Sequence, residues 1–227
     1  MFLESDNMSV GIIGAGASGC ICAYHLLKAG ISVTLYDKNL PLRTILPTGG
    51  GRCNLSYYDT DNFSFARNFP RGEKFLLSVL SSFSMSETVD YFESIGIKTY
   101  VQNDNRIFPV CDSSKIVSEI LLNRAKLLGI ELKRGRVKNI TPAEEGFIVT
   151  VDDKTEFYKK IIITTGGKSF DLVKSLVHNI ISPKPALCPL KILESDFNNL
   201  SGMSLKNVDS VVEFQNKKIA KLKGDLL

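Results

Sequence analysis

The sequence predicts an α/β fold with a parallel sheet at its centre, and three observations support this prediction. An apolar run, residues 8–13, leads into Gly14-Ala-Gly16-Ala-Ser-Gly19. A second apolar stretch, residues 31–36, ends at Asp37. A third, residues 159–165, leads into Gly166-Gly167 and has the continuous apolar character of a strand buried on both faces. The first two runs together indicate a βαβ unit that binds a dinucleotide.

Each glycine of the first motif has a separate reason to lack a side chain. Gly14 allows the tight turn after the strand, Gly16 allows the backbone to approach a pyrophosphate, and Gly19 allows the helix to pack on the strand. The helix that begins here points free N–H groups at the phosphates, and the Asp37 carboxylate can accept hydrogen bonds from ribose hydroxyls. This pattern predicts a dinucleotide ligand but does not distinguish NAD from FAD.

Composition excludes several classes of protein. The 227 residues are 44% hydrophobic and 23% charged, which is typical of a globular chain. No apolar run approaches the roughly 20 residues that a membrane span requires. The net charge of +4 is spread along the chain rather than gathered in a basic stripe. We therefore expect a cytoplasmic protein with a small-molecule substrate, without a membrane or nucleic-acid partner.

The cysteines and histidines predict no metal site. The five cysteines are scattered, with no C-x-x-C pair and no histidines at ligand spacing, so reduced thiols are expected. The two histidines, His25 and His178, are interpreted as packing or surface residues.

Helical spacing dominates the middle of the chain. The expected helices cover residues 17–29, 75–83, 85–95 and a segment from Ser113 or Ser114 to Leu128. Ser84-Met-Ser-Glu87 is a capping box at the start of one of them. Because residues 38–54 contain two prolines and three successive glycines, the chain does not continue from Asp37 into the next βα unit of an NAD-type domain.

The second half of the chain is predicted to be richer in strands. Residues 130–133 return to the parallel sheet, and residues 137–140, 147–151 and 155–158 form an antiparallel meander. A helix is expected over residues 170–181, and Pro183 and Pro185 mark a boundary. Residues 208–214 and 217–223 are expected to pair across Gln215-Asn216. The predicted domains are therefore 1–185 and an incomplete β-rich region, 186–227.

The loop Thr48-Gly-Gly-Gly-Arg-Cys-Asn54 has two interpretations. Three glycines expose backbone N–H groups and permit unusual φ angles, as close contact with a phosphate or a flat ring requires. The alternative is a flexible surface loop. Arg52 and Asn54, directly beside the glycines, favour a ligand-binding loop. Cys53 is interpreted as a structural thiol, since no second cysteine lies at redox spacing.

The motifs, taken in order, resemble the BaiN/YhiN-like flavoproteins, and the Gly-Gly-Gly-Arg-Cys-Asn motif is the most specific of them. That family consists of FAD-dependent oxidoreductases, some labelled aminoacetone oxidases and some bile-acid reductases. The resemblance covers nearly the whole chain and corresponds to about the first half of such a protein. The motifs that support it are Gly14 to Gly19, Thr48 to Asn54, Arg106-Ile-Phe-Pro109, Thr165-Gly-Gly167, Pro185 to Leu190 and Leu200 to Leu205.

The resemblance implies a Rossmann-type FAD-binding domain with an antiparallel β-meander and a helical excursion, followed by the start of a β-rich second domain. It also implies that Val137 contacts adenine through its backbone and that Thr165 to Gly167 face the cofactor. Catalytic residues are not assigned. The candidate cofactor-binding residues are Gly14, Ala15, Gly16, Ser18, Gly19, Asp37, Lys38, Arg43, Gly49, Gly50, Gly51, Arg52, Cys53, Asn54, Val137, Thr165, Gly166 and Gly167.

The leading functional hypothesis is an FAD-binding oxidoreductase that acts on a small organic substrate, with NAD(P)H as a candidate electron donor. In this class the flavin carries the hydride chemistry, so no acid–base dyad is needed. One alternative is a truncated or degenerate flavoprotein fragment without independent catalysis. A further alternative is a flavin-dependent RNA-modifying enzyme, because that class shares the glycine motif and the chain is mildly basic.

Overall fold

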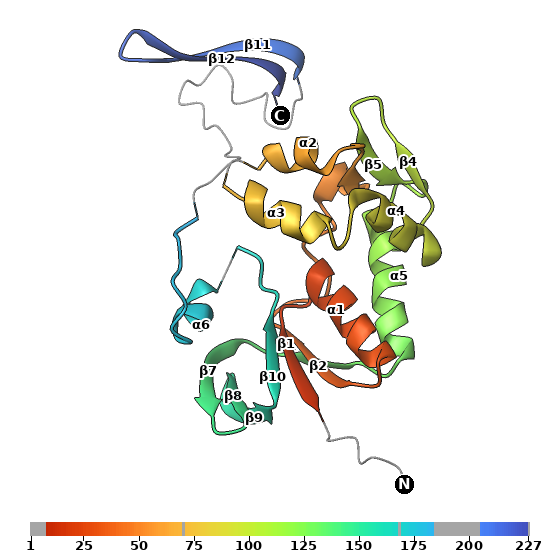
Figure 1. Cartoon of the computed structure of the whole chain (residues 1–227), viewed down its shortest axis with the longest axis vertical. Helices are drawn as coiled ribbons and strands as arrows, with labels where there is room; N and C mark the ends of the chain where they lie inside the picture. Colours follow the sequence, from red (N-terminus) through yellow and green to blue (C-terminus); the bar gives the residue numbers. More distant parts are fainter. Residues whose placement is uncertain (1–7, 70, 168, 184–204, 227) are drawn as a thin grey trace, which may run out of the picture. The chain divides into compact units, whose positions relative to one another are not determined.

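A computed structural model of the chain describes residues 8–69, 71–167, 169–183 and 205–226 (Figure 1). The chain divides into two compact units, Met1–Ile181 and Ser182–Leu227, and each is described by itself. The predicted domain boundary between residues 185 and 186 lies outside the described residues. Among the described residues, no helix has both the length and the apolar character needed to cross a membrane.

A four-stranded parallel sheet forms the centre of the first unit. Its strand order is β10-β1-β2-β6, with every neighbouring pair parallel. The register places Ile13 opposite both Tyr36 and Ile163, and Asp37 opposite Arg134. The carboxyl ends of the four strands therefore meet along one edge. The strands are β1 (Ser9–Ile13), β2 (Ser32–Asp37), β6 (Glu131–Arg134) and β10 (Lys160–Ile163).

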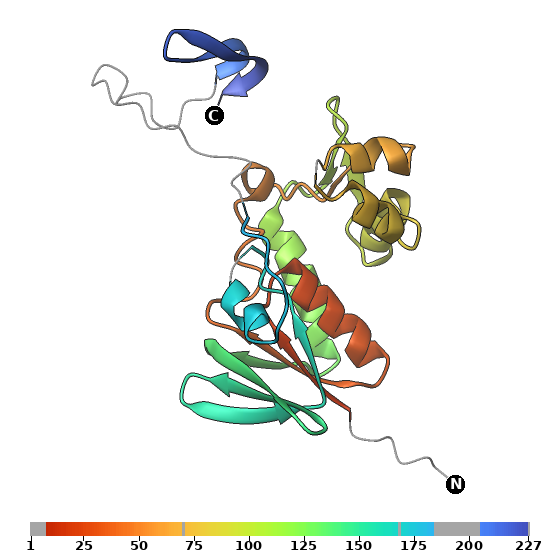
Figure 2. The same cartoon turned by 60° about the vertical axis from the view of Figure 1, so that its left-hand side comes forward.

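Alternation along the strands gives the sheet two separate cores. Ile12 and Leu35 pack with Ala23 of helix α1 (Ala17–Lys28) and Val117 of helix α5 (Ser114–Leu127). Both helices lie on this side of the sheet (Figure 2). The predicted helices over residues 17–29 and from Ser113 are thus confirmed, and the Ser113 side chain accepts a hydrogen bond from the backbone N–H of Ile116 as the N-cap.

The meander covers the other face. The next residues along the two central strands, Ile13 and Tyr36, pack with Val137, Ile140 and Val149. The three strands pair antiparallel in the order β7-β8-β9, as predicted. They are β7 (Val137–Ala143), β8 (Gly146–Val151) and β9 (Lys154–Tyr158). Since Val137 opens the meander directly after the β6 edge, the meander begins where the parallel strands end.

The helical excursion forms its own small assembly. Helix α2, which the sequence analysis did not predict, begins at Asn62 because Asp61 caps it, accepting from the backbone N–H groups of Phe63 and Ser64. The predicted capping box is confirmed: Ser84 and Glu87 each accept a hydrogen bond from the other's backbone N–H. The elements are α2 (Asn62–Arg67), α3 (Glu73–Leu80), α4 (Met85–Ser94) and an antiparallel sheet of β3 (Ser56–Tyr57), β5 (Arg106–Pro109) and β4 (Thr99–Val101).

Two predicted elements near the end of the chain have different outcomes. The helix expected over residues 170–181 is much shorter, α6 (Phe170–Lys174). The chain leaves helical geometry at Val177, a β-branched residue with φ of 65°, so the helix cannot continue to Ile181. The expected hairpin is confirmed: β11 (Leu205–Phe214) pairs antiparallel with β12 (Lys217–Leu226), and Gln215 and Asn216 both have positive φ.

A chain of polar side chains joins the edge of the parallel sheet to the meander. Lys133 of β6 donates to Glu156 of β9 at 2.6 Å, and Glu156 also accepts from the Tyr158 hydroxyl at 2.9 Å. The Tyr158 hydroxyl in turn shares a hydrogen bond with the hydroxyl of Tyr36. Burial tends to raise the pKa of Glu156, but its hydrogen bonds from Lys133, Tyr36 and Tyr158 outweigh burial and lower that pKa below its usual 4.5.

We expect Glu156→Gln to lower the free energy of unfolding by about 1 kcal/mol at pH 7, because an ionised partner of Lys133 is lost from a partly exposed site. A carboxyl group with a depressed folded pKa stabilises above its unfolded pKa and loses that contribution as the pH falls through the folded value. The difference from wild type should therefore shrink below pH 4.5 in denaturant titrations. The exposed Glu119→Gln is the control. A difference that is equal at pH 7 and in acid contradicts this assignment.

Candidate dinucleotide-binding site

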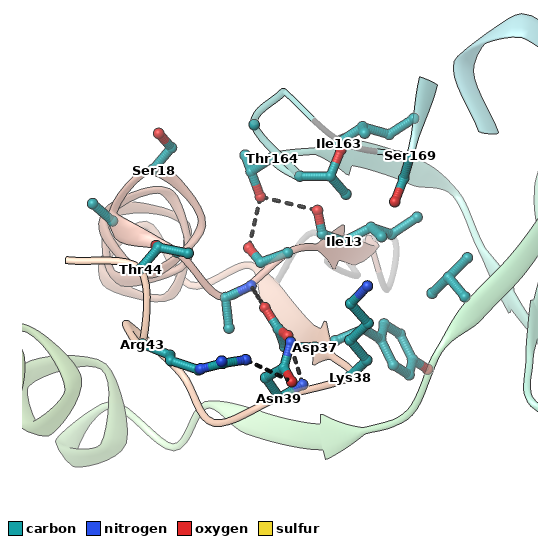
Figure 3. A pocket seen from close by; sticks show the side chains of 18 of the residues that line it. Ile13, Ser18, Asp37, Lys38, Asn39, Arg43, Thr44, Ile163, Thr164 and Ser169 are labelled. Atoms are coloured by element: carbon teal, nitrogen blue, oxygen red, sulfur yellow. Dashed lines mark hydrogen bonds between the residues drawn. The ribbon is translucent and has the colours of Figure 1, made fainter. Parts of the chain in front are cut away.

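The turn after β1 requires a glycine. Gly14 has a φ of 108°, and its N–H donates to the carbonyl of Tyr36 at 2.8 Å. A Cβ at this position would lie 2.5 Å from the carbonyl oxygen of Thr164. The Thr164 hydroxyl donates to the carbonyl oxygens of Ile13 and Gly14, at 3.1 and 2.8 Å (Figure 3). The turn is therefore clamped between β2 and the segment that follows β10.

Gly19 and Gly16 lack side chains for different reasons. A Cβ on Gly19 would collide with the carbonyl oxygen of Gly14, so this glycine brings α1 against the turn. A Cβ on Gly16 would meet only the Thr44 hydroxyl, at the ordinary distance of 3.7 Å, and Gly16 has negative φ. Nothing in the described chain requires a glycine there. The open space beside Gly16 fits a group that comes from outside the chain.

The beginning of α1 has the properties of an anion site. Gly16 is the N-cap and supplies no side-chain acceptor, and the first turn contains no acidic residue. The first backbone N–H groups of a helix have no partner within the helix, and the helix dipole places partial positive charge there. In this 12-residue helix they are directed at the space next to Gly16.

Asp37 is held firmly at the end of β2. One carboxylate oxygen accepts from the backbone N–H of Ala15 at 2.9 Å, and the other accepts from that of Asn39 at 2.7 Å. The Asn39 side chain accepts from the Arg43 guanidinium at 3.2 Å (Figure 3). A carboxylate has about four acceptor positions, so two bonds fix its orientation and leave capacity for hydroxyl groups.

These groups line a cavity of about 1000 Å³ at the carboxyl edge of the parallel sheet. Such a volume lies at the upper end of the range for small-molecule sites and suits a dinucleotide better than a smaller ligand. Three cationic side chains and one carboxylate line the cavity, which favours an anion. Its lining residues are Ile13, Gly14, Ala15, Gly16, Ala17, Ser18, Tyr36, Asp37, Lys38, Asn39, Leu40, Arg43, Thr44, Ile45, Pro47, Gly135, Arg136, Val137, Ile163, Thr164, Thr165, Gly166, Gly167, Ser169 and Leu172.

Eleven of the candidate residues from the sequence line this cavity: Gly14, Ala15, Gly16, Ser18, Asp37, Lys38, Arg43, Val137, Thr165, Gly166 and Gly167. Gly19 lies behind it, against Gly14. Asn39, Thr44, Arg136 and Thr164 also line the cavity and were not predicted from the sequence. Arg136 and Thr164 follow the carboxyl ends of β6 and β10, so the rule that ligands bind at that edge of a parallel sheet could have identified both.

The glycine loop is fastened to the small antiparallel sheet. Gly49, Gly50 and Gly51 all have positive φ within the short 3₁₀ turn η1 (Thr48–Gly51). The Arg52 guanidinium lies 4.0 Å from the centre of the Phe108 ring and donates to the carbonyl of Gly49 at 3.3 Å. Gly49 itself leaves no room for a Cβ beside Phe108.

Other residues of the glycine loop bond to the small antiparallel sheet or lie beside open space. The Asn54 amide, in its better-satisfied orientation, donates to the carbonyls of Ser56 and Ile107. The candidate residues Gly49, Gly50, Gly51, Arg52, Cys53 and Asn54 are not among those that line the cavity, whereas Ile45 and Pro47 just before them are. A Cβ added at Gly50 or Gly51 would meet no described atom within 4 Å, so these two glycines leave open space beside the loop.

Two thiols near these loops are shielded. Burial, with a smaller contribution from Asp37, raises the pKa of Cys20 to about 12. Burial also raises the pKa of Cys53, and a hydrogen bond with Thr48 only partly offsets it. Both sulfurs are protonated near neutral pH, in agreement with a structural role. No group of three or more metal-binding side chains occurs within the described ranges.

A second cavity of about 660 Å³ adjoins the first. The two cavities share Ile163, Thr165 and Gly166. The second cavity is lined mostly by apolar side chains of the meander, β10 and the segment around α6. His178 is also among its lining residues. A molecule bound at Thr165 in the first cavity would therefore border an apolar space.

Comparison with known proteins gives one family match. The model of the family described as HI0933-like protein Rossmann domain matches residues 8–178. The chain is 27% identical over 220 residues to a ribosomal RNA dihydrouridine synthase of Haemophilus influenzae. The matched region covers 88% of this chain and 53% of that protein. It thus spans about half the length of that relative.

Two further similarities are weaker. A thiamine thiazole synthase of Pyrococcus abyssi is 24% identical over 196 residues, covering 71% of this chain and 78% of the relative. Among solved structures, the crystal structure of THI4 from Thermovibrio ammonificans is similar with a TM-score of 0.49 and 9% identity, covering 74% of this chain and 62% of that one.

The two helix-start glycines should respond differently to the same substitution. We expect Gly19→Ala to lower the free energy of unfolding by about 1 to 3 kcal/mol or more, because a backbone carbonyl must move. Gly16→Ala should change it by less than about 0.5 kcal/mol. Chemical denaturation of both variants without ligand measures the contrast. Equal losses would show that Gly16 is also a packing glycine.

Thiol reactivity should follow burial. In the native protein we expect iodoacetamide to modify exposed Cys111 and to leave Cys20 and Cys53 unmodified until the chain unfolds. Mass spectrometry of the alkylated peptides identifies each site separately. Native-state labelling of Cys53 as fast as that of Cys111 would refute the structural assignment.

Proposed function

Because the chain belongs to the HI0933-like protein family through its Rossmann domain, we propose that it binds FAD and acts as an FAD-dependent oxidoreductase. The family match agrees with the resemblance drawn from the sequence motifs and with the predicted Rossmann-type fold. The observation that carries the cofactor proposal is the unfilled space at Gly16, beside the uncapped start of α1 and within the same cavity as Asp37.

The cavity offers a place for each part of the cofactor. In our proposal the N–H groups at the start of α1 and the Arg43 guanidinium bind the diphosphate. Asp37 accepts from the ribose hydroxyls, and the Val137 backbone contacts adenine. Thr165 to Gly167 face the isoalloxazine end, next to the apolar second cavity. In our proposal the glycine loop, residues 49–54, continues this site beyond Pro47, which lines the cavity.

The cofactor, when bound, supplies two-electron hydride chemistry. The side chains described here bind and orient it, and Ile13, Ile163 and Leu172 supply an apolar wall that limits water. In this proposal the substrate is a small organic molecule and NAD(P)H is the electron donor. Both remain predictions, as does the cytoplasmic location. Since the chain spans about half of its Haemophilus relative, activity of the chain alone is also a proposal, and NAD(P)H turnover by it would argue against a fragment without catalysis.

A second candidate function is reduction of a base in RNA. The observation that favours it is the match with a protein described as a ribosomal RNA dihydrouridine synthase, over 88% of this chain. In such a reaction the C5=C6 bond of uracil takes up a hydride and a proton, and NAD(P)H is the class of donor that would supply the two electrons. This candidate requires the same FAD site and differs from the first only in the substrate.

Flavin binding tests the proposed function directly. We expect the protein to gain the two visible flavin absorbance bands with FAD, and we expect Gly16→Val to weaken the affinity on the order of 100-fold, since a branched side chain enters the diphosphate space. Gly72→Ala, at a helix start outside the cavity where a Cβ has ordinary contacts, is the control.

Two results would contradict the proposed function. A folded wild-type chain that retains no flavin absorbance after incubation with FAD and removal of the unbound cofactor would contradict the proposal. So would a Gly16→Val variant that binds FAD as well as wild type while retaining its thermal stability.

A further inference from the structure

We propose that the outer side of the α2–α3 hairpin binds single-stranded RNA. Five exposed side chains of the hairpin, Phe63 and Arg67 of α2, Lys74 and Phe75 of α3 and Arg71 between the helices, are called here the aromatic–basic surface. The proposal rests on the second candidate function, which supplies RNA as the substrate, and it names the part of this chain that would hold the strand.

The packing of the two helices determines which side chains remain outside. Ala66, Leu76 and Leu77, together with Leu80, belong to the core between α2, α3 and the start of α4. The helices lie side by side (Figure 1). Phe63 precedes Arg67 by four residues, so both lie on one face of α2, and both are exposed.

The exposed aromatic rings are large and uncovered. Phe75 is 73% exposed and Phe63 is 60% exposed, values that a core residue does not have. Phe75 also begins an exposed stripe on α3 that continues at Val79, one turn later. Surfaces that expose several such groups together usually have a binding partner.

The cations favour RNA over protein as that partner. Residues 61–80 contain three cations, Arg67, Arg71 and Lys74, and two acidic residues, Glu73 and Asp61, of which Asp61 is engaged as the N-cap of α2. The structure shows no ion pair for any of the three cations among the residues it describes. Alternation of aromatic rings with cations is how single-strand binding surfaces stack bases and neutralise phosphates.

The test uses the full chain and a fluorescein-labelled 12-nucleotide oligouridine, with binding followed by fluorescence anisotropy. We expect binding that weakens as salt is raised, because phosphate contacts release counterions. Phe75→Ala and Lys74→Ala should each weaken it by about 10-fold, and Lys74→Ala should also reduce the salt dependence. Both side chains are exposed, so thermal stability should not change.

Two matched controls lie elsewhere in the same unit. Phe157 is an exposed phenylalanine of β9, and Lys115 is an exposed lysine of α5; neither lines the described cavities. Phe157→Ala and Lys115→Ala should leave the affinity for oligouridine unchanged. All four variants should bind FAD as wild type does.

Three results would overturn the proposal. The first is no oligouridine binding at low salt by a chain that binds FAD; this leaves the flavin proposal intact. The second is equal affinity in wild type and all four variants, which would place the RNA elsewhere. The third is self-association or capture of another protein that Phe75→Ala abolishes while RNA binding persists. Conversely, RNA binding that depends on Phe75 in a chain that fails to bind FAD would support the surface and refute the oxidoreductase.

Discussion

The close approach of α1 to the turn after β1 is the constraint on which the site depends. Gly19 stands against the carbonyl of Gly14, and Gly14 stands against the backbone at Thr164. The Thr164 hydroxyl then bonds to two carbonyls of the turn. Because a carbon atom cannot be added at either glycine, the start of α1 is held at the junction of β1, β2 and β10. The proposed anion site depends on this packing, which brings the helix end to the sheet edge.

Two hydrophobic cores, one on each face of the parallel sheet, support that junction. Alternate residues of β1 and β2 enter opposite faces, so Ile12 and Leu35 pack under α1 while Ile13 and Tyr36 pack under the meander. The second face also carries the hydrogen-bonded group of Tyr36, Tyr158, Glu156 and Lys133. Burial with these hydrogen bonds raises the pKa of Tyr36, so its hydroxyl stays protonated. Tyr36 therefore joins the cavity wall to the meander as a neutral, fixed group.

Much of this arrangement could be predicted from local patterns. The βαβ unit, the meander, the capping box at Ser84 and the hairpin across Gln215-Asn216 each depend on residues close together in the sequence, and all four are confirmed. The length of α6 could not be predicted, because it is set by an unusual backbone angle at Val177 rather than by hydrophobic spacing.

The parts of the site that escaped prediction depend on contacts distant in sequence. Arg52 stacks on Phe108, a residue of β5, and the same ring leaves no room for a Cβ at Gly49. Thr164 lies about 150 residues after the turn that it clamps. Arg136 enters the cavity only because β6 pairs beside β2. The sequence identified the glycines, Asp37, Lys38 and Arg43, whereas Arg136 and Thr164 were brought to the cavity by strand order.

The hydrogen bonds of Asp37 determine which backbone N–H groups of the turn remain available to a ligand. The Ala15 N–H is already engaged by this carboxylate, so it is not free to meet a phosphate. Among the described residues, the start of α1 has no side-chain cap, and its first turn contains no acidic residue. A carboxylate that engaged the N–H groups there as well would cancel the positive end of the helix. In sequence, Gly16 thus separates the N–H group bound by Asp37 from the N–H groups at the start of α1, and our proposal places the diphosphate in the open space beside this glycine.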